Sequence, residues 1–99
     1  MQNRRVTVVA RFRSRPGAEE KLKAELLSLV APSRADRGCI NYDLHQSPDD
    51  PALFMFHEDW TSREALDAHL ATPHLDAFDE RTKDLLAEPV EITFWEMIS

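Results

Sequence analysis

Apolar residues recur with two different periods along the first third of the chain, and the change of period predicts two elements. From Arg4 to Arg13 every second residue is apolar, which is typical of a strand with one buried face. From Ala18 to Val30 the leucines are spaced for one face of a helix. Pro16-Gly17 separates the two elements, and Pro32 is expected to end the helix.

The middle of the chain predicts a β-hairpin. Residues Cys39 to Ser47 and Ala52 to Trp60 are rich in apolar and aromatic residues, and Pro48 to Pro51 between them is typical of a turn. A third such segment, Val90 to Ile98, predicts the last strand.

A second helix is predicted between the hairpin and the last strand. Thr61-Ser62 is a helix-start signal, and Glu64 is placed to complete a capping box. The helix should run from about Ser62, be interrupted near Pro73 and resume to about Leu86.

The order of these elements, βαββαβ, predicts an α+β fold of the ferredoxin-like type. Both helices would cover one face of a four-stranded antiparallel sheet, in a single domain spanning residues 1–99. In the last strand, Ile92, Phe94 and Ile98 face one way, and Thr93, Trp95 and Met97 face the other. Because the second sheet face also carries bulky apolar residues, we expect a homodimer in which a second copy covers it.

Charge and composition exclude several classes of function. Twelve Lys and Arg residues stand against 18 Asp and Glu residues, a net charge of −6. This balance argues against a nucleic acid or an anionic membrane as partner. No long apolar run is present, so a cytoplasmic protein is expected. Cys39 is the only cysteine and is interpreted as a small buried apolar residue.

The four histidines raise the question of a metal site. His69 and His74 are five residues apart, which places them on different faces of a regular helix. His57 and Asp59 share one side of a strand, but two ligands do not make a closed site. The sequence therefore predicts a protein without a bound metal.

Residues 54–78 form the candidate ligand site. A strand delivers Trp60 to the start of the helix that carries His69, and an indole and an imidazole among apolar side chains suit a flat aromatic ligand. Tyr42 could donate a hydrogen bond or a proton. The apolar wall and the rim would come from Phe54, Phe56, Leu66 and His74.

Each of these residues also has a purely structural interpretation. His69 could be a core histidine bound to a backbone carbonyl, Trp60 could fill the core beneath the helix, and His74 could be an exposed helix cap.

The order and spacing of short motifs resemble the antibiotic biosynthesis monooxygenase superfamily. They are Arg15-Pro16-Gly17, Gly38-Cys39 with Tyr42, Glu58-x-Trp60, and Ala65-Leu66-x-x-His69-x-x-x-Pro73-His74. The resemblance is closest to the quinol monooxygenase branch, and it implies a dimeric α+β barrel. The haem-degrading branch would require an Asn, a Trp and a His where this chain has Ala10, His69 and Asp79, so haem is not expected.

Two functions follow from the residues and the resemblance. The first is a monooxygenase that needs no cofactor: His69 takes a proton from a hydroquinone or polycyclic phenol, the electron-rich anion reduces dioxygen, and Tyr42 returns a proton. The second is an isomerase or small-metabolite binding protein similar to the phosphorylated-autoinducer branch, which shares Thr72-Pro73-His74. A phosphorylated substrate would need cations nearby, and the candidates are Arg63, Arg81 and Lys83.

Overall fold

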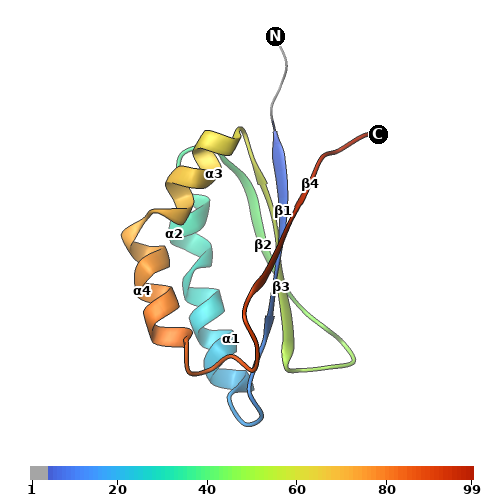
Figure 1. Cartoon of the computed structure of the whole chain (residues 1–99), viewed down its shortest axis with the longest axis vertical. Coiled ribbons are helices and arrows are strands. Elements are labelled where there is room, and N and C mark those ends of the chain that lie inside the picture. The colour runs from blue at the N-terminus through green and yellow to red at the C-terminus, as the bar shows by residue number, and fades with distance from the viewer. Residues whose placement is uncertain (1–4) are drawn as a thin grey trace.

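The computed structural model describes residues 5–99 and has four strands and four helices in this range (Figure 1). Arg4, the first residue of the predicted strand, lies outside the described residues. The elements are β1 (Val6–Arg13), α1 (Glu19–Ser28), α2 (Val30–Arg34), β2 (Cys39–Gln46), β3 (Leu53–Trp60), α3 (Arg63–Leu70), α4 (Pro73–Thr82) and β4 (Glu91–Trp95). The strands form one antiparallel sheet of order β2-β3-β1-β4. The predicted ferredoxin-like α+β fold is confirmed.

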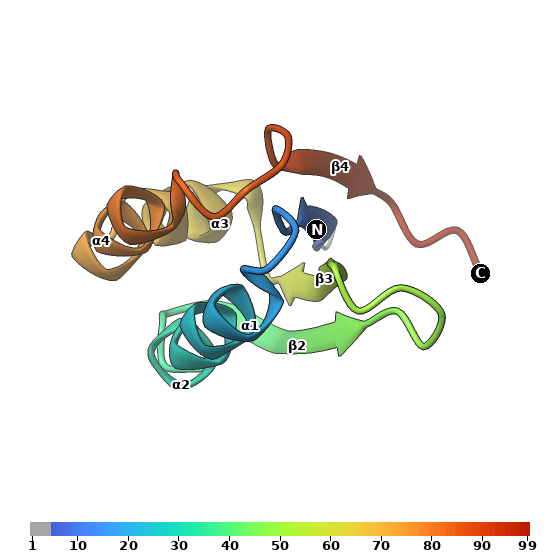
Figure 2. The ribbon, with the colours of Figure 1, turned by 90° about the horizontal axis from the view of Figure 1, so that it is seen from below.

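All four helices lie on the same face of the sheet, here called the inner face (Figure 2). Alternate residues of β1 and β3 point toward the helices, and three leucines of the first helical segment pack against them. Val8, Ala10, Phe12, Phe54, Phe56 and Trp60 from the strands and Leu22, Leu26 and Leu29 from the helical side make up most of this core.

The first helical segment differs from the prediction because Pro32 does not end it. A first helix ends at Ser28, Leu29 follows as its cap, and α2 begins at Val30. Pro32 therefore lies in the first turn of a new helix, where a backbone N–H has no intrahelical acceptor and proline removes no hydrogen bond.

The second helical segment begins and breaks where the sequence predicted. The Ser62 hydroxyl accepts a hydrogen bond from the backbone N–H of Ala65, which caps α3. Because this cap places Ala65 at the third helical position, Glu64 does not complete a capping box. Thr72 caps α4, and that helix ends at Thr82, before Leu86, which forms a bridge with Ser14 instead.

A close approach at Gly38 joins the start of β2 to α3. Gly38 has a positive φ of 87°, and a Cβ atom built there would lie 2.5 Å from the Cβ of Ala65. Two residues later, Ile40 is the extra residue of a bulge and is exposed. The bulge leaves Tyr42 facing the core.

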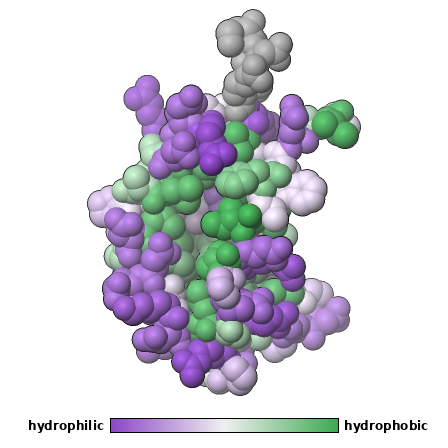
Figure 3. Space-filling view, viewed as in Figure 1, coloured by the Kyte–Doolittle hydropathy of each residue, from purple (hydrophilic) through white to green (hydrophobic). Residues whose placement is uncertain are grey.

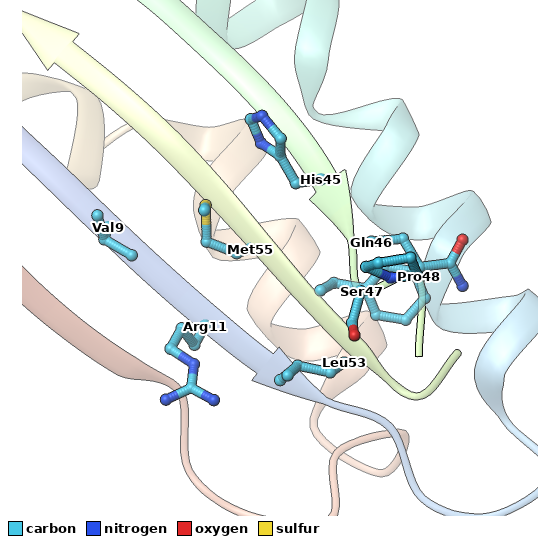
Figure 4. A pocket seen from close by; sticks show the side chains of 9 residues that line it. Val9, Arg11, His45, Gln46, Ser47, Pro48, Leu53 and Met55 are labelled. Carbon is cyan, nitrogen blue, oxygen red and sulfur yellow. The ribbon is translucent and has the colours of Figure 1, made fainter. Parts of the chain in front are cut away.

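The other face of the sheet, here called the outer face, is not covered by any element of residues 5–99 (Figure 2). Val9, Leu53 and Met55 lie on it around a hollow of about 440 Å³ (Figure 4). Ion pairs also lie there, such as the one between Arg11 and Glu91. The outer face therefore carries both apolar and charged side chains.

The inner face of β4 extends beyond the helices. Ile92 and Phe94 pair with inward-facing residues of β1, yet both are exposed. Figure 3 shows apolar side chains gathered between the helical layer and β4. None of the helices in residues 5–99 has the length and apolar character needed to cross a membrane.

Candidate functional site

A cavity of about 290 Å³ lies between the helices and the inner face of the sheet. Its wall is mostly apolar and includes Phe12, Phe56, Phe78 and Ile92. Four polar or titratable side chains also line it, namely Tyr42, Glu58, His69 and Asp79. An apolar cavity with a few polar groups is the usual form of a small-molecule site.

His69 is held at the end of α3 by a carboxylate from a distant part of the chain. The Nδ1 atom of His69 lies 2.8 Å from Oδ2 of Asp36, which follows α2. Because a carboxylate accepts hydrogen bonds, Nδ1 donates the proton, and Nε2 is the nitrogen left with a lone pair. His69 is 2% exposed, and this burial lowers its pKa while Asp36 acts in the opposite direction.

Trp60 supports His69 from within the core. The two rings are stacked with centroids 4.4 Å apart and an angle of 33° between their planes. The sequence predicted that Trp60 would wall the site or stack on a ligand. In the structure Trp60 is fully buried and is not among the residues that line the cavity. Trp60 is buried because it ends β3 directly beneath the start of α3, which covers its side chain.

Glu58 lines the cavity, and the sequence reasoning did not select it as a site residue. It is 5% exposed, and Nε1 of Trp60 donates a hydrogen bond of 2.9 Å to its Oε1. Burial raises the pKa of Glu58 to about 7, although the bond from Trp60 lowers it. The strand period could have revealed this residue, because Glu58 shares the inward face of β3 with Phe56 and Trp60.

Tyr42 faces Glu58 from the neighbouring strand. Its ring packs against Phe56, with centroids 4.4 Å apart. Burial, and then the negative charge of Glu58, raise the pKa of Tyr42, so that its hydroxyl stays protonated. Burial also raises the pKa of the nearby Cys39 thiol to about 11, which does not favour a nucleophilic thiolate.

His74 lies beside His69, contrary to the argument from their spacing. The Nε2 atom of His74 is 2.9 Å from the same Asp36 Oδ2 that binds His69. Residues five apart lie on different faces only within one continuous helix. Here the helix breaks at Thr72-Pro73, and the first turn of α4 brings His74 back toward His69. The side-chain cap of α4 is Thr72.

The remaining predicted residues are divided between the cavity and the core. Phe56 lines the cavity, whereas Phe54 and Leu66 are buried outside its lining. The three candidate phosphate-binding cations lie in surface pairs: Arg63 with Asp67, Arg81 with Glu25, and Lys83 with Glu80. The lining of the cavity includes no Lys or Arg among residues 5–99.

The fold and the cavity define a class: a ferredoxin-like α+β protein with an apolar cavity beneath its helices. Residues 5–81 match the sequence profile described as antibiotic biosynthesis monooxygenase. The chain belongs to this family.

Relatives and solved structures agree with this assignment. A Mycobacterium tuberculosis protein named "Putative monooxygenase Rv0793" is 42% identical over 88 residues, which are 89% of this chain and 86% of the relative. Its solved structure superposes with a TM-score of 0.90 at 37% identity, covering 96% of both chains. The structure of PA3566 from Pseudomonas aeruginosa has a TM-score of 0.92 at 38% identity and covers 100% of this chain and 98% of that chain.

Proposed function

We propose that this protein is a cofactor-independent monooxygenase that oxidises a hydroquinone or a polycyclic phenol with dioxygen. The observation that carries the proposal is the histidine in the cavity: Asp36 holds its Nδ1 proton, and the lone pair remains on Nε2. Membership of the antibiotic biosynthesis monooxygenase family and the monooxygenase name of a relative support this class of reaction.

The first step is the transfer of the phenolic proton to Nε2 of His69. Asp36 stabilises the imidazolium that forms, since its carboxylate lies 2.8 Å from Nδ1. The apolar wall binds the rings of the substrate and keeps water from the phenolate. The phenolate is then electron-rich enough to reduce dioxygen.

The second step forms a bond between a ring carbon and oxygen. The phenolate gives two electrons to dioxygen, and the resulting peroxide takes a proton to become a carbon hydroperoxide. Loss of the hydrogen on that carbon with cleavage of the O–O bond then leaves a carbonyl and releases water. One oxygen atom enters the quinone product, the other enters water, and the substrate supplies all four electrons.

Glu58 is the group best suited to protonate the peroxide. Its pKa of about 7 means that a substantial fraction is protonated at neutral pH. Tyr42, which the sequence suggested for this step, has a raised pKa and is better suited to donate a hydrogen bond than a proton. We assign Glu58 as the acid and Tyr42 as a hydrogen-bond donor to the developing anion.

The isomerase or binding-protein alternative fits the cavity less well when the ligand is phosphorylated. Among residues 5–99, the lining of the cavity includes the acids Glu58 and Asp79 but no Lys or Arg. An anionic phosphate would meet an acidic wall there. A neutral aromatic ligand meets no such repulsion.

We also propose that the protein acts as a homodimer built through the outer face. Three observations support this arrangement: no element of residues 5–99 covers the face, Val9, Leu53 and Met55 surround a hollow on it, and Trp95 and Met97 are exposed beside it. A second copy would cover these apolar groups.

Oxygen uptake with a panel of hydroquinones and anthrone-type phenols tests the proposed reaction. We expect uptake above the spontaneous rate for at least one substrate, with one ¹⁸O atom from labelled dioxygen in the quinone product. Phosphorylated metabolites, assayed for isomerisation by NMR, provide the comparison. If no phenol is oxidised and a phosphorylated metabolite is converted, the alternative function replaces the proposal.

A further inference from the structure

Asp36, His69 and His74 bring three metal-ligating atoms together, and of these residues only His69 is among those that line the cavity. Each residue offers one atom, and these atoms all lie within 4.8 Å of one another. The residues come from three separate parts of the chain: the segment after α2, the end of α3 and the first turn of α4. Two imidazoles and one carboxylate are a ligand set that binds divalent transition metals.

We propose that Asp36, His69 and His74 form a binding site for a divalent transition-metal ion of the zinc class. The ion would bind Oδ2 or Oδ1 of Asp36, Nδ1 of His69 and Nε2 of His74. Water or a small ligand would complete a four-coordinate site.

The site is accessible from solvent but firmly anchored. The side chain of His69 is 2% exposed, whereas those of Asp36 and His74 are 17% and 28% exposed. The stacked Trp60 ring holds the imidazole of His69 in place. A buried, positioned ligand with two more exposed partners lets an ion enter and leave without unfolding of the helices.

Side-chain movements are needed to accept an ion. In a tetrahedral zinc site with bonds of roughly 2.0 Å, ligand atoms lie about 3.3 Å apart. The two His–Asp distances are 2.8 and 2.9 Å, so each must lengthen by about half an ångström as hydrogen bonds are replaced by metal bonds. The two histidine nitrogens lie within 4.8 Å of each other and must approach by up to about 1.5 Å. Rotation of the partly exposed His74 and Asp36 side chains can supply this change.

The donor set also indicates which ions are favoured. One carboxylate and two imidazoles suit Zn²⁺, Co²⁺, Ni²⁺ and Cu²⁺. Ca²⁺ takes six to eight oxygen ligands and Mg²⁺ favours an octahedral shell of oxygens, and this cluster offers neither.

An ion at this site would switch off the proposed base, a consequence that rests on the proposed function. Nδ1 of His69 would give its lone pair to the metal, and the ring proton would then reside on Nε2. Nε2 would change from a proton acceptor into a hydrogen-bond donor. Zinc would thus act as an inhibitor of this protein.

Binding is tested on the full chain after treatment with a chelator. Zinc chloride is titrated by calorimetry, and cobalt chloride is followed by visible absorption, which reports the coordination number. We expect one ion per chain. Tryptophan fluorescence should also change, because Trp60 stacks on His69, one of the proposed metal ligands.

His74→Ala and the nearly isosteric Asp36→Asn should each weaken zinc binding by at least about 100-fold, since loss of even an outer-shell partner costs 10–100-fold. Circular dichroism checks that both variants are folded.

His45→Ala is the matched control, because His45 is exposed and its ring bonds only to a backbone carbonyl among the described residues. The control should bind zinc as the wild type does. Absence of stoichiometric zinc binding, or equal weakening in His45→Ala, would overturn the site.

The inhibition is tested once a phenol that the protein oxidises has been identified. Stoichiometric zinc should then lower the oxygen uptake of the wild type but not of His74→Ala. Zinc binding without this inhibition would overturn the switch and leave the site in place.

Discussion

Glu58 and Trp60 project from the same side of β3, and the indole Nε1 of Trp60 donates a hydrogen bond of 2.9 Å to Oε1 of Glu58. Both side chains are buried. A single indole donor does not offset the loss of hydration of the carboxylate, which is why the pKa of Glu58 is raised to about 7. This pair links the stability of the fold to pH and to the chemistry of the cavity.

Glu58 should make the protein less stable as pH rises from about 5 to 8. Its pKa is about 7 in the folded protein against an ordinary 4.5, so the folded state binds more protons than the unfolded state in this window. The loss of stability caused by Glu58 is absent at pH values below its ordinary pKa of 4.5. It is complete at pH values above its pKa of about 7 in the folded protein. A difference of about 2.5 units corresponds to a loss on the order of 3 kcal/mol, at about 1.36 kcal/mol per unit. Urea unfolding at several pH values measures it.

Glu58→Gln provides the control for this pH dependence. It removes the titrating group and keeps a side chain that can accept the Trp60 hydrogen bond. The variant should show a clearly flatter dependence of the unfolding free energy between pH 5 and 8. An unchanged slope would assign the dependence to other groups.

Trp60→Phe should destabilise the protein and raise the pKa of Glu58 further. The variant keeps a buried ring against His69 but removes the donor to the carboxylate. Leaving a buried acceptor without its partner costs about 1–3 kcal/mol, in addition to the cost of the smaller ring. Trp95→Phe is the comparison, because Trp95 is exposed within a single chain and its Nε1 bonds to Thr93; the proposed dimer would cover it, so both variants are unfolded at the same low protein concentration. Equal losses of unfolding free energy in the two variants would show that the buried Trp60–Glu58 hydrogen bond contributes no more to stability than the exposed Trp95–Thr93 bond.

Gly38→Ala should be far more destabilising than Gly17→Ala. Both glycines have positive φ, so each variant carries a backbone strain of roughly 1–2 kcal/mol. A Cβ at Gly38 would also collide with Ala65, whereas one at Gly17 meets nothing within 4 Å. Overpacking should add about 1–3 kcal/mol at Gly38 alone. Thermal and urea unfolding of the two variants measures the difference, and equal losses would contradict the close approach of β2 and α3.

His69→Gln should lower the rate of phenol oxidation by on the order of 10²–10⁴-fold, because it removes the proposed base. His69 is buried and stacked on Trp60, so some loss of stability is also expected. The rate is therefore measured well below the unfolding temperature of the variant. His57→Gln, on the outer face, is the control and should keep the wild-type rate. A His69→Gln variant that oxidises the substrate at the wild-type rate would remove His69 from the mechanism.

Met55→Asp should prevent the proposed dimer. Met55 lines the hollow of the outer face, where a second copy would bury the new charge without a partner (Figure 4). Light scattering at micromolar concentration should show a dimer for the wild type and a monomer or unstable protein for the variant. A stable wild-type monomer would rule out the dimer, whereas a Met55→Asp variant that remains dimeric would rule out the outer face as its interface.

The local pattern of residues determined the elements and the orientation of their side chains. The alternation in β1 indicated which of its residues face the core, and the signals at Ser62 and Pro73 placed the start of α3 and the break before α4. These features depend on neighbouring residues, so a linear chain discloses them. The same period would also have placed Glu58 on the inner face, although its raised pKa depends on the burial that packing creates.

Only the tertiary structure decided which polar groups meet. Asp36 is 33 residues from His69 and 38 from His74, yet one carboxylate oxygen binds both rings. The spacing of the two histidines predicted separate faces because that rule holds within one regular helix, whereas two helices and a turn bring these residues together. Likewise, Trp60 was expected beside the ligand, but the depth of a side chain depends on how the helices pack over the strand. Contacts between distant segments are set by packing, which local periodicity does not encode.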